Sequence, residues 1–193
     1  MMRNLLKKVA LALSLAAVYP FALLEIALRA TFSKDVFFLA QSQTISLIPG
    51  KFGSYMRNAY YHLTLQSCPL DCYFAFGMTF THSAVSVGHR VYVGSYSMIG
   101  MASIGDDYMI SDHVHVLSGG RQHSTTISDI PFQRQPVCFS SVSIGNNVWI
   151  GTRCVVMQDI GRDCIIGAGS VVNKPLPSKC LAAGVPARVL RMS

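Results

Sequence analysis

The chain has 193 residues and a mass of 21.0 kDa, which fits one domain with room for an appendage. Hydrophobic residues make up 51% of it and charged residues 13%, so an intrinsically disordered chain is excluded. The formal net charge is +7, but residues 1–34 contribute +4 of it, from five Lys and Arg residues minus one Glu. The remaining charge is too dilute for a nucleic-acid-binding surface, and we expect no nucleic-acid partner.

The N-terminus is the most hydrophobic part of the chain. Residues 9–28 form an apolar run that is interrupted by Ser14, Pro20 and Glu25. About 20 apolar residues can span a bilayer, although a charge in its core costs about 2.5–3.5 kcal/mol. Pro20 lacks a backbone N–H and is expected to kink or divide the helix. We predict that the protein associates with a membrane through residues 1–34, by a helix that spans the bilayer or lies in it. A secretory signal, or a helix that packs on the domain or on a neighbouring subunit, remains an alternative.

An aliphatic residue recurs every six positions in the second half of the chain and is usually followed by glycine. A period of six does not fit a helix of 3.6 residues per turn, but it suits short strands joined by sharp corners. Three such strands close one coil of about 18 residues, and coils stack about 4.8 Å apart. We expect the glycine to supply corner conformations that a Cβ would hinder. The aliphatic anchors are Val87, Val93, Ile99, Ile104, Ile110, Val116, Ile144, Ile150, Val156, Ile160, Ile166 and Val172.

The position four residues after an anchor is also regular. It is mostly small or β-branched and is predicted to point into the core. Two of the six cysteines fall there, and we expect Cys154 and Cys164 to stack as small core residues in adjacent coils. The cysteines lack C-x-x-C spacing, so neither a zinc site nor a disulfide scaffold is predicted from them. The residues at this position are Val91, Ser97, Val114, Val148, Cys154, Cys164 and Ser170.

Together these patterns predict a mainly β fold in two regions. Residues 1–71 form a hydrophobic and amphipathic helical region, and residues 72–193 form a parallel β-helix of about five coils. The repeat stops within residues 117–143, which is too long for a corner and predicts an excursion loop. The two prolines in residues 175–177 are expected to end the β-helix, and residues 180–190 to fold back as a closing segment.

Three segments resemble a known family. They are IGNNVWIG at residues 144–151, IGAGSVV at residues 166–172 and AGVPARVL at residues 183–190. Through them, and over about residues 72–191, the chain resembles the left-handed parallel β-helix, hexapeptide-repeat acyltransferases, in particular the galactoside, maltose and xenobiotic acetyltransferases. The resemblance implies a left-handed coil and a homotrimer with active sites between adjacent prisms. It also implies acetyl-CoA, or another acyl-CoA, as co-substrate, with no metal required.

The resemblance points to one catalytic residue in the excursion loop. The family's loop carries a histidine that acts as general base, and His123 aligns with it. A sugar hydroxyl is a poor nucleophile at neutral pH, and an imidazole is suited to accept its proton as it attacks a thioester. The nearby Gly119 and Gly120 would offer backbone N–H groups to the oxyanion. Three further histidines are expected to bind the acceptor: His82, His113 and His115.

The coenzyme A site is also implied by the resemblance. A tryptophan would flank its channel, small residues would form a bare wall for the pantetheine arm, and late basic residues would meet the nucleotide end. The residues concerned are Trp149, Gly151, Gly167, Ala168, Gly169, Lys174 and Arg188.

The predicted activity is therefore transfer of an acyl group, in particular acetyl, from coenzyme A to a sugar hydroxyl. A saccharide or lipid-linked saccharide in surface polysaccharide or glycolipid synthesis is the expected acceptor, at the cytoplasmic face of the inner or plasma membrane. One alternative is a zinc-dependent hydro-lyase of the carbonic anhydrase type on the same prism. It would use His113 and His115, because H-x-H in a strand places both imidazoles on one face. A non-catalytic trimeric scaffold is the other alternative.

Overall fold

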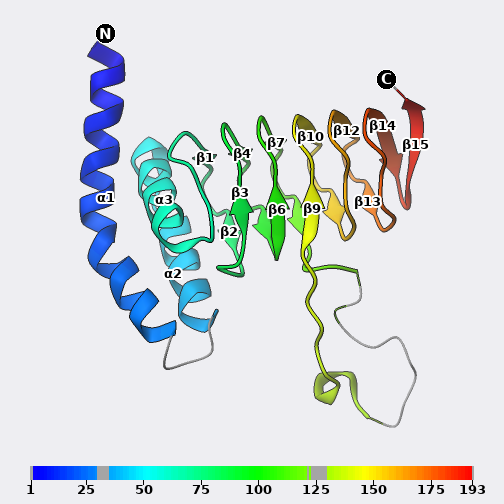
Figure 1. Ribbon diagram of the computed structural model, residues 1–193, viewed down its shortest axis with the longest axis horizontal. Helices are drawn as coiled ribbons and strands as arrows, with labels where there is room; N and C mark the ends of the chain where they lie inside the picture. Colours follow the sequence, from blue (N-terminus) through cyan, green and yellow to red (C-terminus); the bar gives the residue numbers. More distant parts are fainter. Residues whose placement is uncertain (1, 30–34, 121, 123–129, 193) are drawn as a thin grey trace.

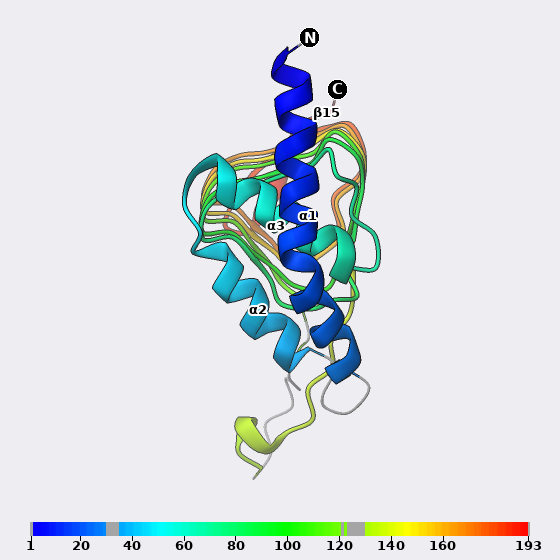
Figure 2. The same cartoon turned by 90° about the vertical axis from the view of Figure 1, so that its left-hand side faces the viewer.

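A computed structural model describes residues 2–29, 35–120, 122 and 130–192 (Figure 1). Three helices come first in the chain: α1 (Met2–Arg29), α2 (Val36–Ser46) and α3 (Gly50–Thr64). Short strands follow and wind into a solenoid, whose coils superpose when it is seen from its helical end in Figure 2. The helices therefore cap one end of a stack of coils.

The strands are mostly two or three residues long, as expected for the flat sides of a hexapeptide coil. They are β1 (Tyr73–Phe74), β2 (Thr79–Phe80), β3 (Ser86–Val87), β4 (Tyr92–Val93), β5 (Met98–Ile99), β6 (Ala102–Ile104), β7 (Met109–Ile110), β8 (His115–Val116), β9 (Val142–Ile144), β10 (Val148–Ile150), β11 (Val155–Val156), β12 (Cys164–Ile166), β13 (Val171–Val172), β14 (Cys180–Gly184) and β15 (Ala187–Met192), with a 3-10 helix η1 (Phe132–Arg134).

Each side of the solenoid is a parallel sheet, apart from the antiparallel last strand β15. A seven-stranded sheet has the order β1-β4-β7-β10-β12-β14-β15, a five-stranded sheet the order β13-β11-β8-β5-β2, and a three-stranded sheet the order β3-β6-β9. Bridges from Ile144 to Ile160 and on to Leu176 continue the third side. The predicted parallel β-helix is confirmed, whereas the left-handed sense of its coil stays a prediction.

The solenoid has about six turns rather than the five predicted, because it continues past the two prolines. Leu176 lies between them and still bridges to Ile160, and β14 then pairs in parallel with β12. Pro175 and Pro177 flank this bridge, and the Leu176 N–H donates to the Asp159 carbonyl at 2.9 Å. The chain ends with β15 antiparallel to β14, as expected for a closing strand.

The core is built as the repeat predicts. All twelve aliphatic anchors are buried, and so are the small residues four positions later. The expected stacking of Cys154 on Cys164 is wrong, because the two lie on different sides of the solenoid. Cys164 follows Val148 in the seven-stranded sheet, and its Sγ lies 3.5 Å from that of Cys180.

The reason for the glycine after each anchor differs from the one expected. Its φ is not positive in the repeat coils, whereas the residue two positions later has a left-handed φ of 54° to 60° in most of them. A Cβ on Gly88 would lie 2.7 Å from the carbonyl carbon of Gly105, and one on Gly145 would lie 2.5 Å from the amide nitrogen of Arg162. Glycine is thus required because adjacent coils approach too closely for a side chain. The left-handed residues are Arg90, Tyr96, Asp107, His113, Asn147, Arg153, Asp163 and Lys179.

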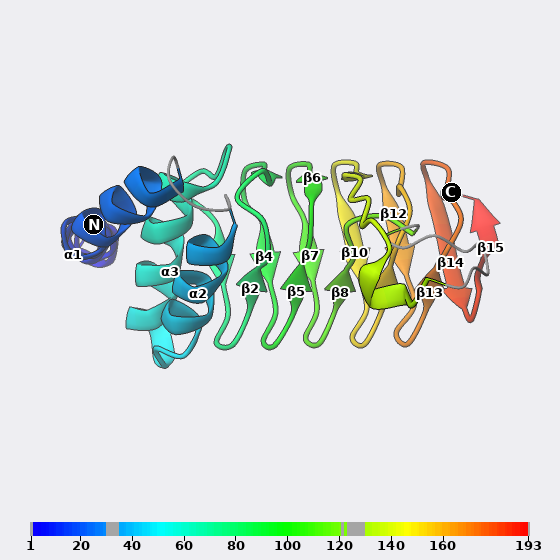
Figure 3. The same ribbon diagram turned by 90° about the horizontal axis from the view of Figure 1, so that it is seen from below.

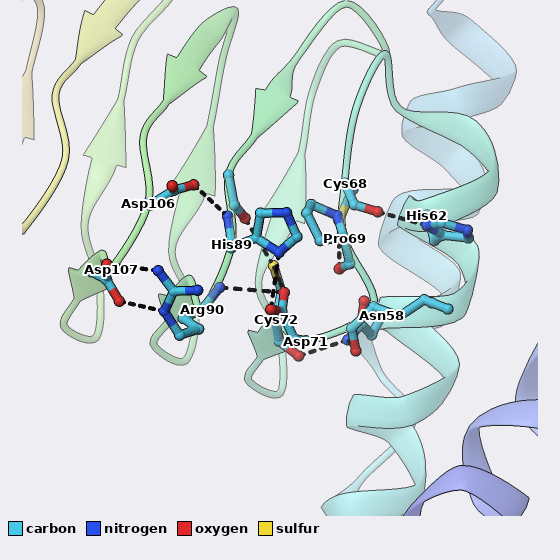
Figure 4. Close-up of polar contacts among 12 residues, drawn as sticks. Asn58, His62, Cys68, Pro69, Asp71, Cys72, His89, Arg90, Asp106 and Asp107 are labelled. Atoms are coloured by element: carbon cyan, nitrogen blue, oxygen red, sulfur yellow. Dashed lines mark hydrogen bonds and ion pairs between the residues drawn. The ribbon is translucent and has the colours of Figure 1, made fainter.

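Acidic and amide side chains satisfy backbone donors at the corners. Asp106 Oδ1 accepts the His89 N–H at 2.8 Å in the preceding coil, and Asn146 Oδ1 accepts the Asp106 N–H at 3.1 Å in the same way. Figure 4 shows this corner, where Arg90 also pairs with Asp107. These carboxylates therefore hold coils together and are not free for catalysis.

A buried arginine joins the helices to the first coil. Arg57 of α3 donates from Nε to the Phe74 carbonyl at 2.9 Å and from Nη1 to the Ile48 carbonyl at 2.8 Å. Its Nη1 also lies 3.3 Å and 3.2 Å from the carbonyl oxygens of Ile45 and Ser46, at the end of α2. Burial lowers the pKa of Arg57, while the negative end of the α2 dipole favours its charge.

Two more residues of α3 add three polar contacts to the same junction. Asn58 Nδ2 donates to the carbonyl oxygens of Leu70 and Cys72, at 2.9 Å and 2.6 Å (Figure 4). His62 Nδ1 lies 2.7 Å from the Cys68 carbonyl oxygen. The chain between α3 and β1 is thus fixed by side chains of α3.

Helix α1 packs across α3 along one face. Its buried residues Ser14, Val18, Ala22 and Glu25 follow helical spacing. Glu25 pairs with Arg29, whose Nη2 also donates to the Thr64 carbonyl at 2.8 Å. The helix is not divided at Pro20, as the sequence had allowed, although Figure 1 shows its axis changing direction in the second half.

We predict that Gly53→Ala destabilises the protein by about 1–3 kcal/mol, because overpacking a close contact costs this much. A Cβ at Gly53 would lie 1.9 Å from the Ile48 carbonyl oxygen, which Arg57 also binds. Urea unfolding followed by circular dichroism measures the change. Lys51→Ala, at an exposed position of the same helix, is the control and is expected to change the free energy of unfolding by less than about 0.5 kcal/mol. An equal effect of both variants would contradict the prediction.

A second prediction concerns thiol reactivity. Cys138 is exposed and the other five cysteines are buried. Burial raises the pKa of Cys180 to about 11 and also raises that of Cys154, so neither forms much thiolate at neutral pH. A thiol titration of the native protein is expected to find one fast thiol, and the unfolded protein six. Loss of the fast thiol in Cys138→Ser identifies it; three or more fast thiols in the native protein would show that the core is open.

Candidate functional site

The excursion loop leaves the solenoid between β8 and β9, in the third coil (Figure 1). Its two legs are bonded near the solenoid, because the Ser140 N–H donates to the Ser118 carbonyl at 3.1 Å and the Cys138 N–H donates to the Gln122 carbonyl at 2.9 Å. The excursion predicted from the interrupted repeat is present. The proposed base, His123, follows Gln122 in the chain but lies outside the described residues.

The root of the loop is fixed to the coils on both sides. Ser118 is buried, and its Oγ accepts the Met101 N–H of the preceding coil at 3.0 Å. Gly119 has a φ of +83°, and a Cβ there would lie 1.9 Å from Ser140 Oγ. A Cβ on Gly120 would lie 3.1 Å from Gln158 Nε2 of the following coil. The chain therefore leaves the solenoid in one direction, which is set by glycine and by close packing.

His82 lies beside this root. Its ring stands edge-on to that of Phe139, with centroids 4.9 Å apart, and its Nδ1 is 2.8 Å from Thr81 Oγ1. Phe139 lies between Cys138 and Ser140, the two residues whose N–H groups join the legs of the loop. Of the three histidines predicted to bind the acceptor, His82 is thus the one with a ring contact to the described part of the loop.

His113 and His115 do not share a face. His113 occupies a left-handed corner, where its ring stacks on Tyr96 at 5.3 Å, and His115 points outward from β8. The expectation from H-x-H fails because the chain turns a corner between them, so strand alternation does not apply. In the described part of the chain, no three His, Cys, Asp or Glu side chains converge as metal ligands.

Most of the predicted site residues border the outer face of the five-stranded sheet. We call its border with the three-stranded side the loop edge, and its border with the seven-stranded sheet the far edge. His82, Lys174 and the root of the loop lie on the loop edge, and His115 lies on the face itself. On the far edge lie five of the predicted residues: His113, Gly151, Gly167, Ala168 and Gly169.

Two residues predicted to bind the cofactor lie away from the five-stranded sheet. Trp149 is on the seven-stranded sheet, half exposed, with Nε1 3.3 Å from Ser111 Oγ, and Arg188 is exposed on β15. A single copy of the chain thus does not bring all predicted residues together. Gly169 leaves its surroundings open, since a Cβ there would meet nothing within 4 Å.

The three outer faces differ in character, which the sequence reasoning did not recognise. The signal was the residue directly before each anchor, which points outward. On the three-stranded sheet these residues are Ser86, Ser103 and Ser143; on the five-stranded sheet Thr79, Met98, His115, Val155 and Val171; on the seven-stranded sheet Tyr73, Tyr92, Met109, Trp149 and Ile165. The seven-stranded sheet therefore presents an exposed ladder of large apolar side chains, in which Tyr73 and Tyr92 stack at 5.1 Å.

Known proteins share the repeat and the fold. Residues 141–174 match the family model described as bacterial transferase hexapeptide (six repeats). A maltose O-acetyltransferase of Clostridium difficile 630 has a similar structure, with a TM-score of 0.71 and 22% identity over 82% of this chain and 86% of that one. A galactoside acetyltransferase solved in complex with coenzyme A has a TM-score of 0.60 and 23% identity over 80% of each chain.

Two relatives from Escherichia coli K12 are more similar in sequence. The galactoside O-acetyltransferase is 33% identical over 129 residues, which cover 62% of this chain and 57% of the relative. A candidate lipopolysaccharide biosynthesis O-acetyl transferase, WbbJ, is 31% identical over 125 residues, or 61% of this chain and 62% of the relative. Both matches span less than two thirds of the relative's own length. The resemblance of this chain to the hexapeptide-repeat acetyltransferases is thus confirmed by repeat, by sequence and by fold.

Proposed function

We propose that the protein is an O-acetyltransferase that moves the acetyl group of acetyl-CoA to a hydroxyl of a sugar. The observation that supports this most is the loop in the third coil, which is bonded at its root beside His82 and continues into His123. The two E. coli relatives, named for O-acetyl transfer, support the same reaction. We further propose that the acceptor is a saccharide or lipid-linked saccharide of a surface polysaccharide or glycolipid.

In the proposed reaction, His123 accepts the proton of the sugar hydroxyl as its oxygen attacks the thioester carbon. The carbon–sulfur bond then breaks, the acetyl group stays on the sugar oxygen, and the proton passes to the departing thiolate. General base catalysis of this kind contributes about 10²–10⁴-fold to the rate. Backbone N–H groups at the root of the loop would stabilise the oxyanion, since Gly119 and Gly120 hold no side chain in the way.

The chain offers partial support for coenzyme A binding. Gly167, Ala168 and Gly169 form a corner without bulky side chains, on which a pantetheine arm would lie. Lys174 and Arg188 are exposed cations suited to the nucleotide phosphates. Trp149 and Arg188 are separated from the loop edge within one copy, so the site we propose is completed by a neighbouring copy.

For this reason we also propose a homotrimer. The apolar ladder of the seven-stranded sheet, with Tyr92 and Trp149 exposed in the single chain, supports burial against another copy. We place the protein at the cytoplasmic face of the inner or plasma membrane, where acetyl-CoA and lipid-linked sugars would meet.

We predict that His123→Ala lowers kcat for acetyl transfer about 10²–10⁴-fold, because the hydroxyl then lacks its base. Release of free coenzyme A from acetyl-CoA in the presence of galactosides or maltose measures the rate. His89→Ala is the matched control, since His89 is exposed on the same prism and paired with Asp71. Equal rates in both variants would remove the proposed mechanism and favour a scaffold. Hydration of carbon dioxide that depends on His113, His115 and added zinc would favour the hydro-lyase.

The root of the loop gives a further prediction. Gly119→Ala combines a strained φ with a clash at Ser140 Oγ, so it displaces the following residues. Because a misplacement of about 1 Å can cost about 10²-fold in rate, we expect kcat/KM to fall by about this factor. Ser140→Ala removes the oxygen and leaves Gly119 in place; it is expected to keep kcat/KM within about twofold. Thermal unfolding distinguishes a displaced loop from a lost fold.

A further inference from the structure

Helix α1 has one polar stripe, and this stripe faces the domain. Lys7, Ser14, Glu25 and Arg29 recur at helical spacing, together with the small buried residues Val18 and Ala22. From Ser14 onward the stripe is buried against α3. The one acid of the helix is thereby turned away from its outer side.

The opposite face of α1 is apolar and uncovered. Its exposed large side chains run over nearly the whole helix, and in Figure 2 α1 lies outermost, in front of α2 and α3. They are Leu5, Leu6, Val9, Leu13, Tyr19, Phe21, Leu23, Leu24 and Ile26. A surface of this extent, with a polar stripe on the other side, is typical of a helix that lies in a membrane interface.

We propose that α1 lies flat in the interface of an anionic lipid bilayer, with its apolar face toward the acyl chains and the solenoid standing away from the membrane. This inference rests on the proposed membrane location and adds its geometry. Figure 3 shows the first half of α1 nearly end-on at one end of the stack, with the coils extending away from it. A membrane beneath the outer face of α1 therefore leaves the three solenoid faces in water.

The docking of α1 argues against a transmembrane span. The hydrocarbon core is about 30 Å thick and needs about 20 apolar residues surrounded by lipid. Only residues 2–13 precede the first buried position, Ser14, and they extend about 18 Å at 1.5 Å per residue. The rest of the helix is bonded to the domain through Glu25, Arg29 and the Thr64 carbonyl. In-plane binding keeps these contacts, whereas a span would break them.

The charges of α1 favour anionic lipid over a second copy of the chain. Lys7 and Lys8 are exposed and form no ion pair within the described residues, and Glu25, which is paired with Arg29, is buried. A second copy of α1 would bring the same cations, and its one acid, Glu25, is already paired with Arg29. Anionic headgroups supply the missing charge.

Vesicle flotation of the full-length protein tests the binding. Vesicles of phosphatidylcholine with 30% phosphatidylglycerol are expected to float the wild type, and pure phosphatidylcholine to float less of it. Leu13→Asp/Leu24→Asp, two exposed positions on the apolar face, should lower the partition coefficient at least about tenfold. Leu190→Asp, at an exposed apolar position of β15, is the matched control and should bind like the wild type.

Acetyl transfer to a soluble sugar, measured on the same samples, separates this inference from the proposed enzyme activity. Lost flotation with unchanged transfer supports the lipid-binding face. Wild-type protein that stays at the bottom of the gradient overturns it, as does a double variant that floats normally. A double variant that only reduces the size of the assembly in solution shows that a second copy covers the face, and also overturns it.

Depth measurements distinguish a flat helix from a span. In a Cys138→Ser background, a fluorophore is attached to a single cysteine that replaces Leu5, Leu13 or Leu24, and quenching by lipids brominated at known depths is compared. A flat helix places the probes at Leu5 and Leu13, which precede the bend of α1, at the same shallow depth. A gradient of depth along the helix, or protein isolated from cells that lacks residues 1–29, overturns the proposal.

Discussion

A single guanidinium joins the two parts of this molecule. Arg57 is fully buried without a carboxylate partner, and it binds carbonyl oxygens at the end of α2, in the link to α3 and in the first coil. The carbonyl oxygens of Phe74 and Ile48 accept from it in an apolar environment, where an unpaired carbonyl costs about 1–3 kcal/mol. The position of α3 on the solenoid, and through α3 the position of α1, depends on this contact. Gly53 matters for the same reason, since it lets the Ile48 carbonyl approach.

The solenoid provides rigidity, and the loop that interrupts it provides the proposed site. Each coil repeats the same inward contacts, so a residue before an anchor always points out on a known side. The same scaffold presents a row of serines on the three-stranded sheet, a mixed face on the five-stranded sheet and the apolar ladder on the seven-stranded sheet. The three faces differ at one position per hexapeptide. The excursion leaves at the edge of the mixed face, and its root is bonded to the coils before and after it. This arrangement suits a reaction in which a group carried by the loop acts on a substrate held on the rigid face of the solenoid.

The sequence predicted the parts of the fold that depend on periodicity. The inward anchors, the small residues such as Cys154 and Ser170, and the excursion all follow from a six-residue period. It failed where contacts between coils decide the outcome. The stacking of Cys164 depends on register, the repeat glycines on distances between coils, and the separation of His113 from His115 on a corner that local alternation ignores.

Contacts over long sequence distances were also out of reach of pattern reasoning. A charge such as Glu25 is costly in the core of a bilayer, but the structure turns it toward the domain, beside Arg29. Arg57 lies in an amphipathic stretch that gives no sign of its four carbonyl partners. The described residues define the root of the loop that leads to His123. The catalytic role of His123 stays a prediction, which rests on the resemblance to the family.

The order of layers along the stack sets the distance that a lipid-linked acceptor must extend from the membrane to the loop. Helix α1 is outermost, α2 and α3 follow, and the loop leaves from the third coil. With helix layers about 8–10 Å apart and coils about 4.8 Å apart, the root of the loop stands roughly 25–30 Å from the axis of α1. In the proposed orientation, a sugar held directly at the headgroup would fall short of it. By this distance, the protein would select sugars that lie several units from the lipid carrier along a growing saccharide chain.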